Sequence, residues 1–224
     1  MSIIESIRLK FRNRIYIPLT CKERGRRLKD KNFTIISNNC WGGTVYEAYN
    51  LPKGSPTVGL FFMSKDYIEF LSDLKGYVEG ELSFIKPEES RWKNYEEVGG
   101  DERFGTYPIG LLSNGKNTVE VFFLHYHNEK EAYDKWTRRI GRINWKRLLV
   151  KFNDQNGCTE SELRHFNNLP YTNKLFFTCN KWQNFPDKYG VYIKQFPKSK
   201  TMRASYEPFG KNRKINVTEI LNSL

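Results

Sequence analysis

A strand, a glycine-containing loop and a helix are predicted in succession between Asn32 and Glu47, and this stretch constrains the fold more than any other. The apolar, β-branched run Phe33–Ile36 predicts a buried strand, and the following Asn38-Asn39-Cys40-Trp41-Gly42-Gly43 predicts a loop that leads into a helix. An α/β domain commonly begins in this way. Its ligand then lies at the carboxyl end of the strand, beside the unpaired N–H groups of the next helix. We therefore expect an α/β fold with a binding loop at this position.

The chain is long enough for one domain with a substantial core. It has 224 residues, of which 38% are hydrophobic and 15% aromatic, a content that excludes intrinsic disorder despite the mean hydropathy of -0.68. No apolar run approaches the roughly 20 residues that span a bilayer, and the first residues do not resemble a signal peptide. We expect a soluble cytoplasmic protein. Its four cysteines are too widely spaced for a zinc knuckle or a disulfide framework and are expected to be reduced: Cys21, Cys40, Cys158 and Cys179.

The net charge of +12 is concentrated at the two ends of the chain. Residues 1–31 hold ten Lys and Arg against three acids, residues 194–214 hold seven against one, and residues 32–193 are balanced. This pattern predicts a basic N-terminal helix and connector (1–31), an α/β domain (32–193), and a basic C-terminal extension packed on that domain (194–224). Basic ends suit an anionic membrane, nucleic acid or phosphorylated substrate, and simple solubility is the alternative.

The N-terminal segment reads as an amphipathic helix. Ser2 is the predicted N-cap, and Pro18 is expected to end the helix near Ile17. Its apolar positions recur at helical spacing among basic residues: Ile4, Ile7, Phe11 and Ile15. Such a helix can lie in a membrane interface, and packing against the body of the protein is the alternative. Residues 21–29 are expected to form a basic connector.

The rest of the chain alternates predicted strands and helices. Further strands are expected at residues 57–62, 82–85, 107–112, 118–124, 148–152 and 174–179, with an edge strand at 189–193. Helices are expected at residues 44–49, 128–143, 159–166 and 217–221 and after Ser64, and residues 86–106 form a polar excursion. Asn114-Gly115 between two apolar runs predicts a hairpin. The fold class is therefore a single three-layer Rossmann-like α/β domain with a mixed, mostly parallel sheet and an antiparallel hairpin.

Polar side chains follow several of the predicted strands. If these strands are parallel, the side chains share one edge of the sheet, where open α/β sheets bind ligands. The residues concerned are Asn38, Asn39, Cys40, His125, His127, Asn153, Asp154, Asn180 and Lys181.

A nucleophilic centre can be assembled from three of these positions. Cys40, beside a helix N-terminus, is expected to have a lowered pKa and to act as the nucleophile. His125 would be the base and Asp154 would orient it. Simple packing is the alternative for Cys40, and a histidine bonded to the backbone is the alternative for His125. The predicted substrate-binding residues are Asn38, Asn39, Trp41, Gly42, Gly43, Tyr46, His127, Asn153 and Lys181.

Neither a metal nor a cofactor is assigned. His125 and His127 would face the same side of a strand, but the one other histidine, His165, lies in a predicted helix, so no metal site is predicted. Gly42-Gly43 matches neither a P-loop nor the dinucleotide-binding pattern. The cofactor remains unknown.

A group of motifs resembles one bacterial protein family. These are Phe33–Gly43 with its S-N-N-C-W-G-G motif, Ser55–Phe62, Tyr107–Gly110, Phe123–Tyr126 with Lys135-Trp136, and Val150–Asp154. The chain is similar to an uncharacterised family, a domain of unknown function whose members are usually labelled exopolysaccharide or capsule biosynthesis proteins. The resemblance covers nearly the whole chain beyond the basic N-terminus. It implies a single α/β domain with a role in building cell-surface polysaccharide, and it implies no reaction or catalytic residue.

Two functions follow from these observations. The first is a cytoplasmic transferase of exopolysaccharide or capsule biosynthesis, which acts on a glycan or activated sugar at the strand ends and contacts the inner face of the membrane through its basic N-terminus. The second is a non-catalytic binding or scaffold protein of a membrane-associated polysaccharide-assembly complex. A nucleic-acid partner is disfavoured because no RNA-binding motif is visible. The oligomeric state is unknown.

Overall fold

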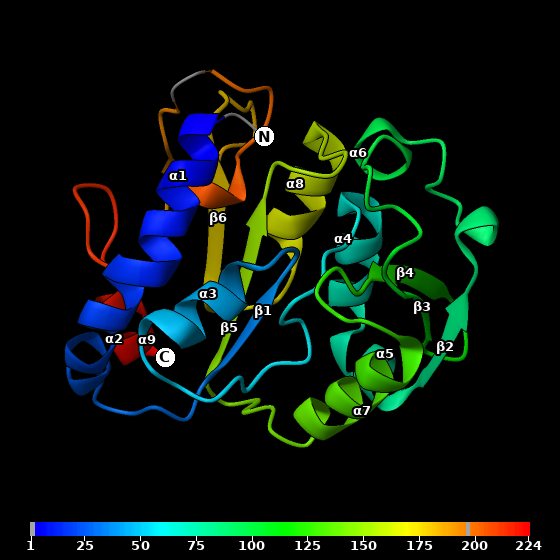
Figure 1. Cartoon of the computed structure of the whole chain (residues 1–224), viewed down its shortest axis with the longest axis horizontal. Helices are drawn as coiled ribbons and strands as arrows, with labels where there is room; N and C mark the ends of the chain where they lie inside the picture. Colours follow the sequence, from blue (N-terminus) through cyan, green and yellow to red (C-terminus); the bar gives the residue numbers. More distant parts are fainter. Residues whose placement is uncertain (1–2, 196–197) are drawn as a thin grey trace.

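The chain folds into an α/β structure with two separate sheets (Figure 1). The computed structural model describes residues 3–195 and 198–224, so the predicted N-cap Ser2 lies outside the described residues. The four strands of the first sheet are all parallel, in the order β1-β5-β6-β7, and the three strands of the second are antiparallel, in the order β2-β3-β4. The α/β prediction is thus confirmed, with the antiparallel strands in a sheet of their own.

The strands lie close to their predicted positions. Those of the parallel sheet are β1 (Thr34–Ser37), β5 (Leu148–Asn153), β6 (Lys174–Thr178) and β7 (Gly190–Tyr192). Those of the antiparallel sheet are β2 (Glu81–Ile85), β3 (Ile109–Ser113) and β4 (Thr118–Phe122). The predicted hairpin is confirmed: Gly115 has a φ of 84°, and the Asn114 side chain accepts the N–H groups of Lys116 and Asn117.

Helices cover both faces of the parallel sheet. On one face, Ile36, Val150 and Phe176 pack with α4 (Ser64–Ser72) and α8 (Glu160–Asn168). On the other, Ile35 and Leu149 pack with α3 (Trp41–Ala48), α2 (Ile17–Arg26) and α9 (Val217–Ser223). Apolar side chains alternate between the two faces because successive residues of a strand point in opposite directions. The sheet and its two helical layers form the predicted three-layer arrangement.

Further helical segments complete the part of the chain that the structure describes. They are α1 (Ile3–Phe11), the π-helical segment η1 (Arg12–Tyr16), α5 (Leu74–Glu79), the 3₁₀ turn η2 (Pro87–Glu89), α6 (Glu96–Gly99), α7 (Glu129–Ile140) and the 3₁₀ turn η3 (Ala204–Tyr206). The predicted caps of two helices are present: Asn128 accepts the N–H of Glu131 before α7, and Thr159 forms a capping box with Glu162 before α8.

Residues 57–62 do not form the predicted strand. Gly59 has a φ of 81°, which interrupts the extended run, and Phe61 alone pairs with a neighbour, in an isolated bridge to Phe122 of β4. The N–H of Phe62 donates to the carbonyl of Asn38, just beyond β1. This segment therefore connects the two sheets instead of adding a strand to either.

The N-terminal helix is longer than predicted, because Pro18 does not end it. The helix runs from α1 through η1 into α2, and the N–H of Ile17 donates to the carbonyl of Arg12 five residues earlier. This wider turn accommodates the missing N–H of Pro18 at the start of α2. The predicted connector at residues 21–29 is in large part helix α2.

Candidate functional site

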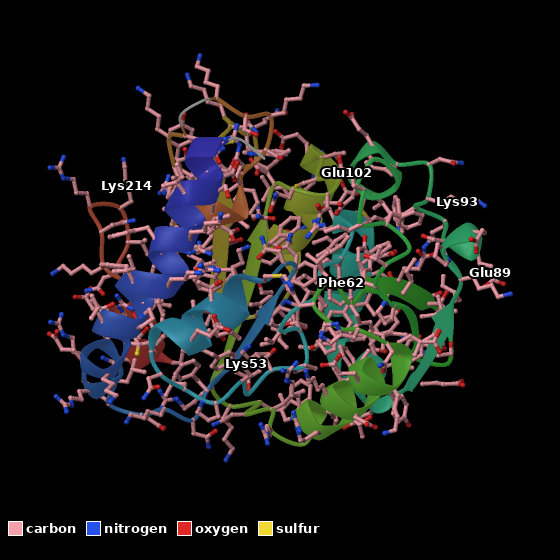
Figure 2. The ribbon with its side chains drawn as sticks, viewed as in Figure 1. Lys53, Phe62, Glu89, Lys93, Glu102 and Lys214 are labelled. Carbon is pink, nitrogen blue, oxygen red and sulfur yellow. The ribbon has the colours of Figure 1, made fainter. Side chains whose placement is uncertain are left out.

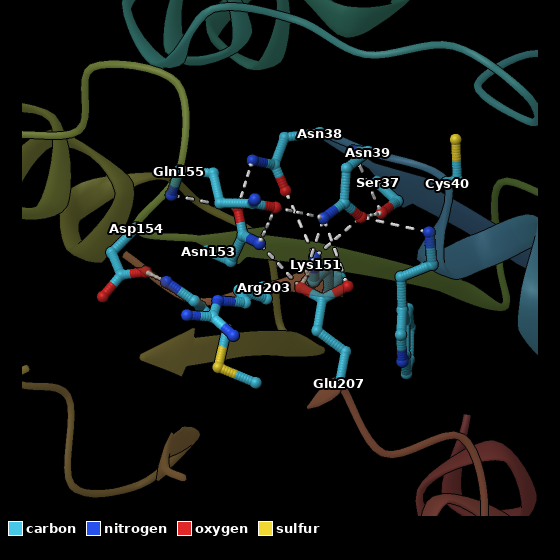
Figure 3. Close-up of polar contacts among 12 residues, drawn as sticks. Ser37, Asn38, Asn39, Cys40, Lys151, Asn153, Asp154, Gln155, Arg203 and Glu207 are labelled. Carbon is cyan, nitrogen blue, oxygen red and sulfur yellow. Dashed lines mark hydrogen bonds and ion pairs between the residues drawn. The ribbon is translucent and has the colours of Figure 1, made fainter. Parts of the chain in front are cut away.

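Polar side chains gather where β1 and β5 end. The two strands are parallel neighbours, with Ser37 opposite Lys151, so Asn38 and Asn39 after β1 lie beside Asn153 at the end of β5 (Figure 3). The amide nitrogen of Asn38 donates to the side-chain oxygen of Asn153 over 2.7 Å. The sequence predicted that these asparagines meet, and the parallel register brings them together.

Lys151 lies at the centre of this cluster. Its side chain is completely buried and forms an ion pair with the equally buried Glu207, and its Nζ donates to Asn39 Oδ1 over 2.9 Å. Burial lowers the pKa of Lys151, and the carboxylate of Glu207 opposes that shift by stabilising the ammonium form. In this buried environment each charge is stabilised by the other, so removal of either residue would leave an uncompensated charge.

Three nitrogen donors from β5 and the loop after β1 surround the Glu207 carboxylate. Besides Lys151, Asn153 Nδ2 donates to Oε1 over 2.7 Å and Asn39 Nδ2 donates to Oε2 over 3.1 Å. Gln155 joins the network by accepting from the same two amides. Glu207 itself comes from the C-terminal extension, which reaches over the ends of β1 and β5 (Figure 3). The donors thus hold an anion that belongs to another part of the chain.

Asp154 fastens this same extension to the sheet. Its Oδ2 accepts from Thr178 Oγ1 (2.6 Å) and Asn180 Nδ2 (3.1 Å), and its Oδ1 accepts from the N–H of Met202 (2.5 Å). Both carboxylate oxygens are therefore occupied by β6, the loop after it and the extension. Asp154 lies beside Asn153 as predicted, but its contacts are not those of a residue that orients His125.

The environment of Cys40 differs from the expected one. Cys40 occupies the N-cap position of α3, and its Sγ lies 3.9 Å from the carbonyl oxygen of Leu60. Burial, reinforced by the charge of Glu207, raises the pKa of the thiol to about 12. The prediction of a lowered pKa is therefore wrong, because desolvation of the thiolate outweighs the stabilisation that the helix N-terminus gives it.

The two histidines follow β4 and so belong to the antiparallel sheet, not to the parallel one. The N–H of His125 donates to the carbonyl of Gly59 over 3.0 Å, and that of His127 donates to the Glu131 carboxylate. Partial desolvation and the charge of Arg103 lower the pKa of His125, which favours its neutral form. Among the described residues, no hydrogen bond joins Cys40, His125 and Asp154. Both Cys40 and His125 nevertheless border the same segment, at Leu60 and Gly59.

Other predicted binding residues have packing contacts. Trp41 Nε1 donates to the carbonyl of Pro208 over 2.8 Å, which adds a further contact with the extension. A Cβ on Gly43 would lie 3.0 Å from Val58, so the glycine allows α3 to pack closely. The Tyr46 hydroxyl accepts from the N–H of Ile35 and is fully buried. Lys181, after β6, is exposed.

Three residues of the cluster were missed in the sequence: Lys151, Gln155 and Glu207. Two of them carried a signal. Lys151 interrupts the apolar run from Leu148 to Phe152, and a lysine in a buried strand requires a buried partner. Glu207 is the one acid among residues 194–214. These two facts mark Lys151 and Glu207 as candidates for a buried pair, and the structure shows that they meet. Gln155 had no comparable signal.

The cluster is closed by the extension, and two surface depressions lie elsewhere. One of about 220 Å³ is lined by Lys22, Arg26 and Tyr49, and another of about 610 Å³ by Asn32 and residues 141–146. Both lie towards the amino ends of β1 and β5. Within residues 3–195 and 198–224, no three His, Cys, Asp or Glu side chains are grouped to hold a metal ion.

The comparisons with known proteins match nearly the whole chain. Residues 11–222 match a family described as a domain of unknown function, DUF1919. The chain is also similar to a protein of Haemophilus influenzae that carries the name "Uncharacterized protein": the two are 31% identical over 203 residues, which cover 91% of this chain and 86% of the relative. A role in polysaccharide synthesis stays a prediction.

Proposed function

The chain belongs to the DUF1919 family, and we propose that it is a cytoplasmic transferase of surface-polysaccharide assembly that binds an activated sugar where β1 and β5 end. The assignment to surface-polysaccharide assembly rests on the family resemblance described above. The class of ligand rests on the chemistry of the buried cluster, in which an ammonium group and several amides are brought together.

The arrangement around Glu207 carries this proposal. Lys151, Asn39 and Asn153 direct N–H donors at one carboxylate, at the position where α/β sheets bind ligands. A buried ion pair contributes little to stability compared with apolar packing of the same volume, so its presence here favours a functional role. In the proposed ligand-bound state, a phosphate group of the activated sugar takes the place of the Glu207 carboxylate on these donors, and the extension moves aside.

The reacting group that suits this ligand is His125. Its lowered pKa keeps the imidazole neutral, as a general base requires. In the proposed step the imidazole accepts the proton of an acceptor hydroxyl, whose oxygen bonds to the sugar carbon. The bond from that carbon to phosphate breaks, and the phosphate group departs with the bonding electrons. Cys40, whose thiol is protonated, would line the site next to Leu60 instead of acting as nucleophile.

Substitution of Glu207 tests the site directly. Glu207→Gln keeps the shape of the side chain but removes its charge, so diphosphate and nucleotide sugars should raise the melting temperature of this variant more than that of the wild type. Glu219→Gln, on exposed surface, is the matched control. If no anionic ligand raises the melting temperature of either the wild type or Glu207→Gln, no anion site exists at this position.

A second function is favoured by a different observation. Four large apolar side chains of the N-terminal helix, from Ile7 to Leu19, are exposed, which suits the non-catalytic binding or scaffold protein of a membrane-associated complex. The two functions separate under substitution: if His125→Gln leaves polysaccharide production intact while removal of residues 1–17 abolishes it, the scaffold is correct. His127→Gln is the control for the histidine change.

A further inference from the structure

The N-terminal helix presents a row of four apolar side chains to solvent. Ile7, Phe11, Ile15 and Leu19 are 62%, 55%, 48% and 78% exposed, and they recur every four residues along α1, η1 and α2. Three of them belong to the stripe that the sequence predicted. Four large apolar side chains in one row on a helix are far more than the scattered exposed residues that soluble proteins tolerate.

The opposite side of this helix is fixed to the protein by specific contacts. Arg24 Nη1 donates to the carbonyl of Ala48 over 2.7 Å, and Glu5 accepts from Ser205 Oγ over 2.7 Å. Gly25 packs so closely on the carbonyl of Tyr49 that a Cβ would overlap it. The helix therefore cannot rotate to bury its apolar row, and the exposure of that row is a property of the fold.

Basic side chains surround the apolar row. Lys10, Arg14 and Lys22 are exposed on the helix itself. Residues 209–214 form a loop beside it, because the Phe209 ring packs on Tyr16 (6.2 Å between centroids). This loop adds exposed Lys211, Arg213 and Lys214. Figure 2 shows Lys214 next to the N-terminal helices, at the opposite end of the molecule from Glu89.

We propose that the helix α1–η1–α2 and the loop 209–214 bind the surface of an anionic lipid bilayer, with the row from Ile7 to Leu19 inserted between the lipids. An apolar row bordered by Lys and Arg matches the two parts of such a surface, its acyl chains and its negative headgroups. Across residues 3–195 and 198–224, no helix is long and apolar enough to cross a membrane. This inference does not depend on whether the protein is a transferase.

Sedimentation with lipid vesicles tests the proposal. The full chain should sediment with vesicles of phosphatidylcholine and phosphatidylglycerol at 3:1 and much less with phosphatidylcholine alone. Leu19→Ser and Phe11→Ser should each weaken binding at least fivefold, and Lys10→Glu combined with Arg14→Glu should weaken it more than tenfold. Tyr133→Ser and Lys116→Glu, exposed residues far from this surface, should bind like the wild type.

Three results would overturn the proposal. Absence of binding to the anionic vesicles excludes the bilayer as the partner. Binding that is unchanged by Leu19→Ser and Phe11→Ser shows adsorption by charge alone, without insertion. A dimer in analytical ultracentrifugation that Phe11→Ser dissociates shows that a second copy covers the row instead. Circular dichroism of each variant confirms that the fold is retained.

Discussion

Lys151 and Glu207 are 56 residues apart in the chain, yet they form an ion pair in which both side chains are fully buried. The pair joins the centre of the parallel sheet to the C-terminal extension. Its two charges depend on each other, because removal of one leaves the other uncompensated in a medium of low polarity. The contact therefore has a measurable signature in stability as well as in ligand binding.

Single substitutions of this pair should be strongly destabilising. We expect Lys151→Met or Glu207→Leu alone to lower the free energy of unfolding by about 3–5 kcal/mol, because each leaves a buried charge without its partner. The double variant should recover most of that loss, since no charge remains. Urea denaturation of all four proteins gives the coupling energy. Additive effects of the two substitutions would show that the pair is not coupled.

The thiol of Cys40 should be unreactive in the folded protein. Its pKa of about 12 leaves almost no thiolate at pH 8, so alkylation by iodoacetamide should be at least tenfold slower in the native state than in urea. Because folding favours the protonated thiol, this contribution to stability is complete below pH 9 and is lost as the pH rises from 9 to about 12. Peptide mass spectrometry measures the alkylation rate. Rapid native labelling at pH 7 would restore the nucleophile hypothesis.

Replacement of Gly25 should disturb the packing of the N-terminal helix against Tyr49. A Cβ at this position overlaps the backbone carbonyl of Tyr49, so Gly25→Ala should cost about 1–3 kcal/mol despite the better helix propensity of alanine. Gly141→Ala is the matched control, because the nearest atom to its Cβ is 3.9 Å away. Thermal denaturation compares the two variants. Equal melting temperatures would mean that the helix shifts to accommodate the Cβ without loss of stability.

Local sequence patterns predicted most elements of the fold, and the exceptions have physical causes. The hairpin at Asn114-Gly115 and the cap at Asn128 depend on neighbouring residues alone, and both are present. The strand expected at residues 57–62 has the right composition, but Gly59 adopts a left-handed conformation that only the tertiary structure reveals.

The candidate site was predictable only in part, because its members come from distant segments. Asn38, Asn39 and Asn153 meet as the parallel arrangement predicts. The contact of Glu207 with Lys151 requires the path of the C-terminal extension, which local patterns do not encode. The direction of the Cys40 pKa shift likewise depends on burial by residues far along the chain, and it was predicted wrongly for that reason.

Loss of the Asp154 carboxylate should release the C-terminal extension from the sheet. Asp154→Ala removes the acceptors of the Met202 N–H and of the Thr178 hydroxyl, so we expect a loss of about 1–3 kcal/mol in stability. The extension should also open more often, which exposes the bonds after Lys200 and Arg203 to trypsin, and cleavage there should accelerate at least fivefold. Asp187→Ala, which removes an exposed carboxylate, is the control and should be cleaved at the wild-type rate. Because Glu207 lies on the same extension, the Asp154 variant should also bind diphosphate more tightly than the wild type if the buried donors form a ligand site. Faster cleavage without tighter binding would show that Asp154 holds the extension in place but that the donors beneath it only stabilise the fold.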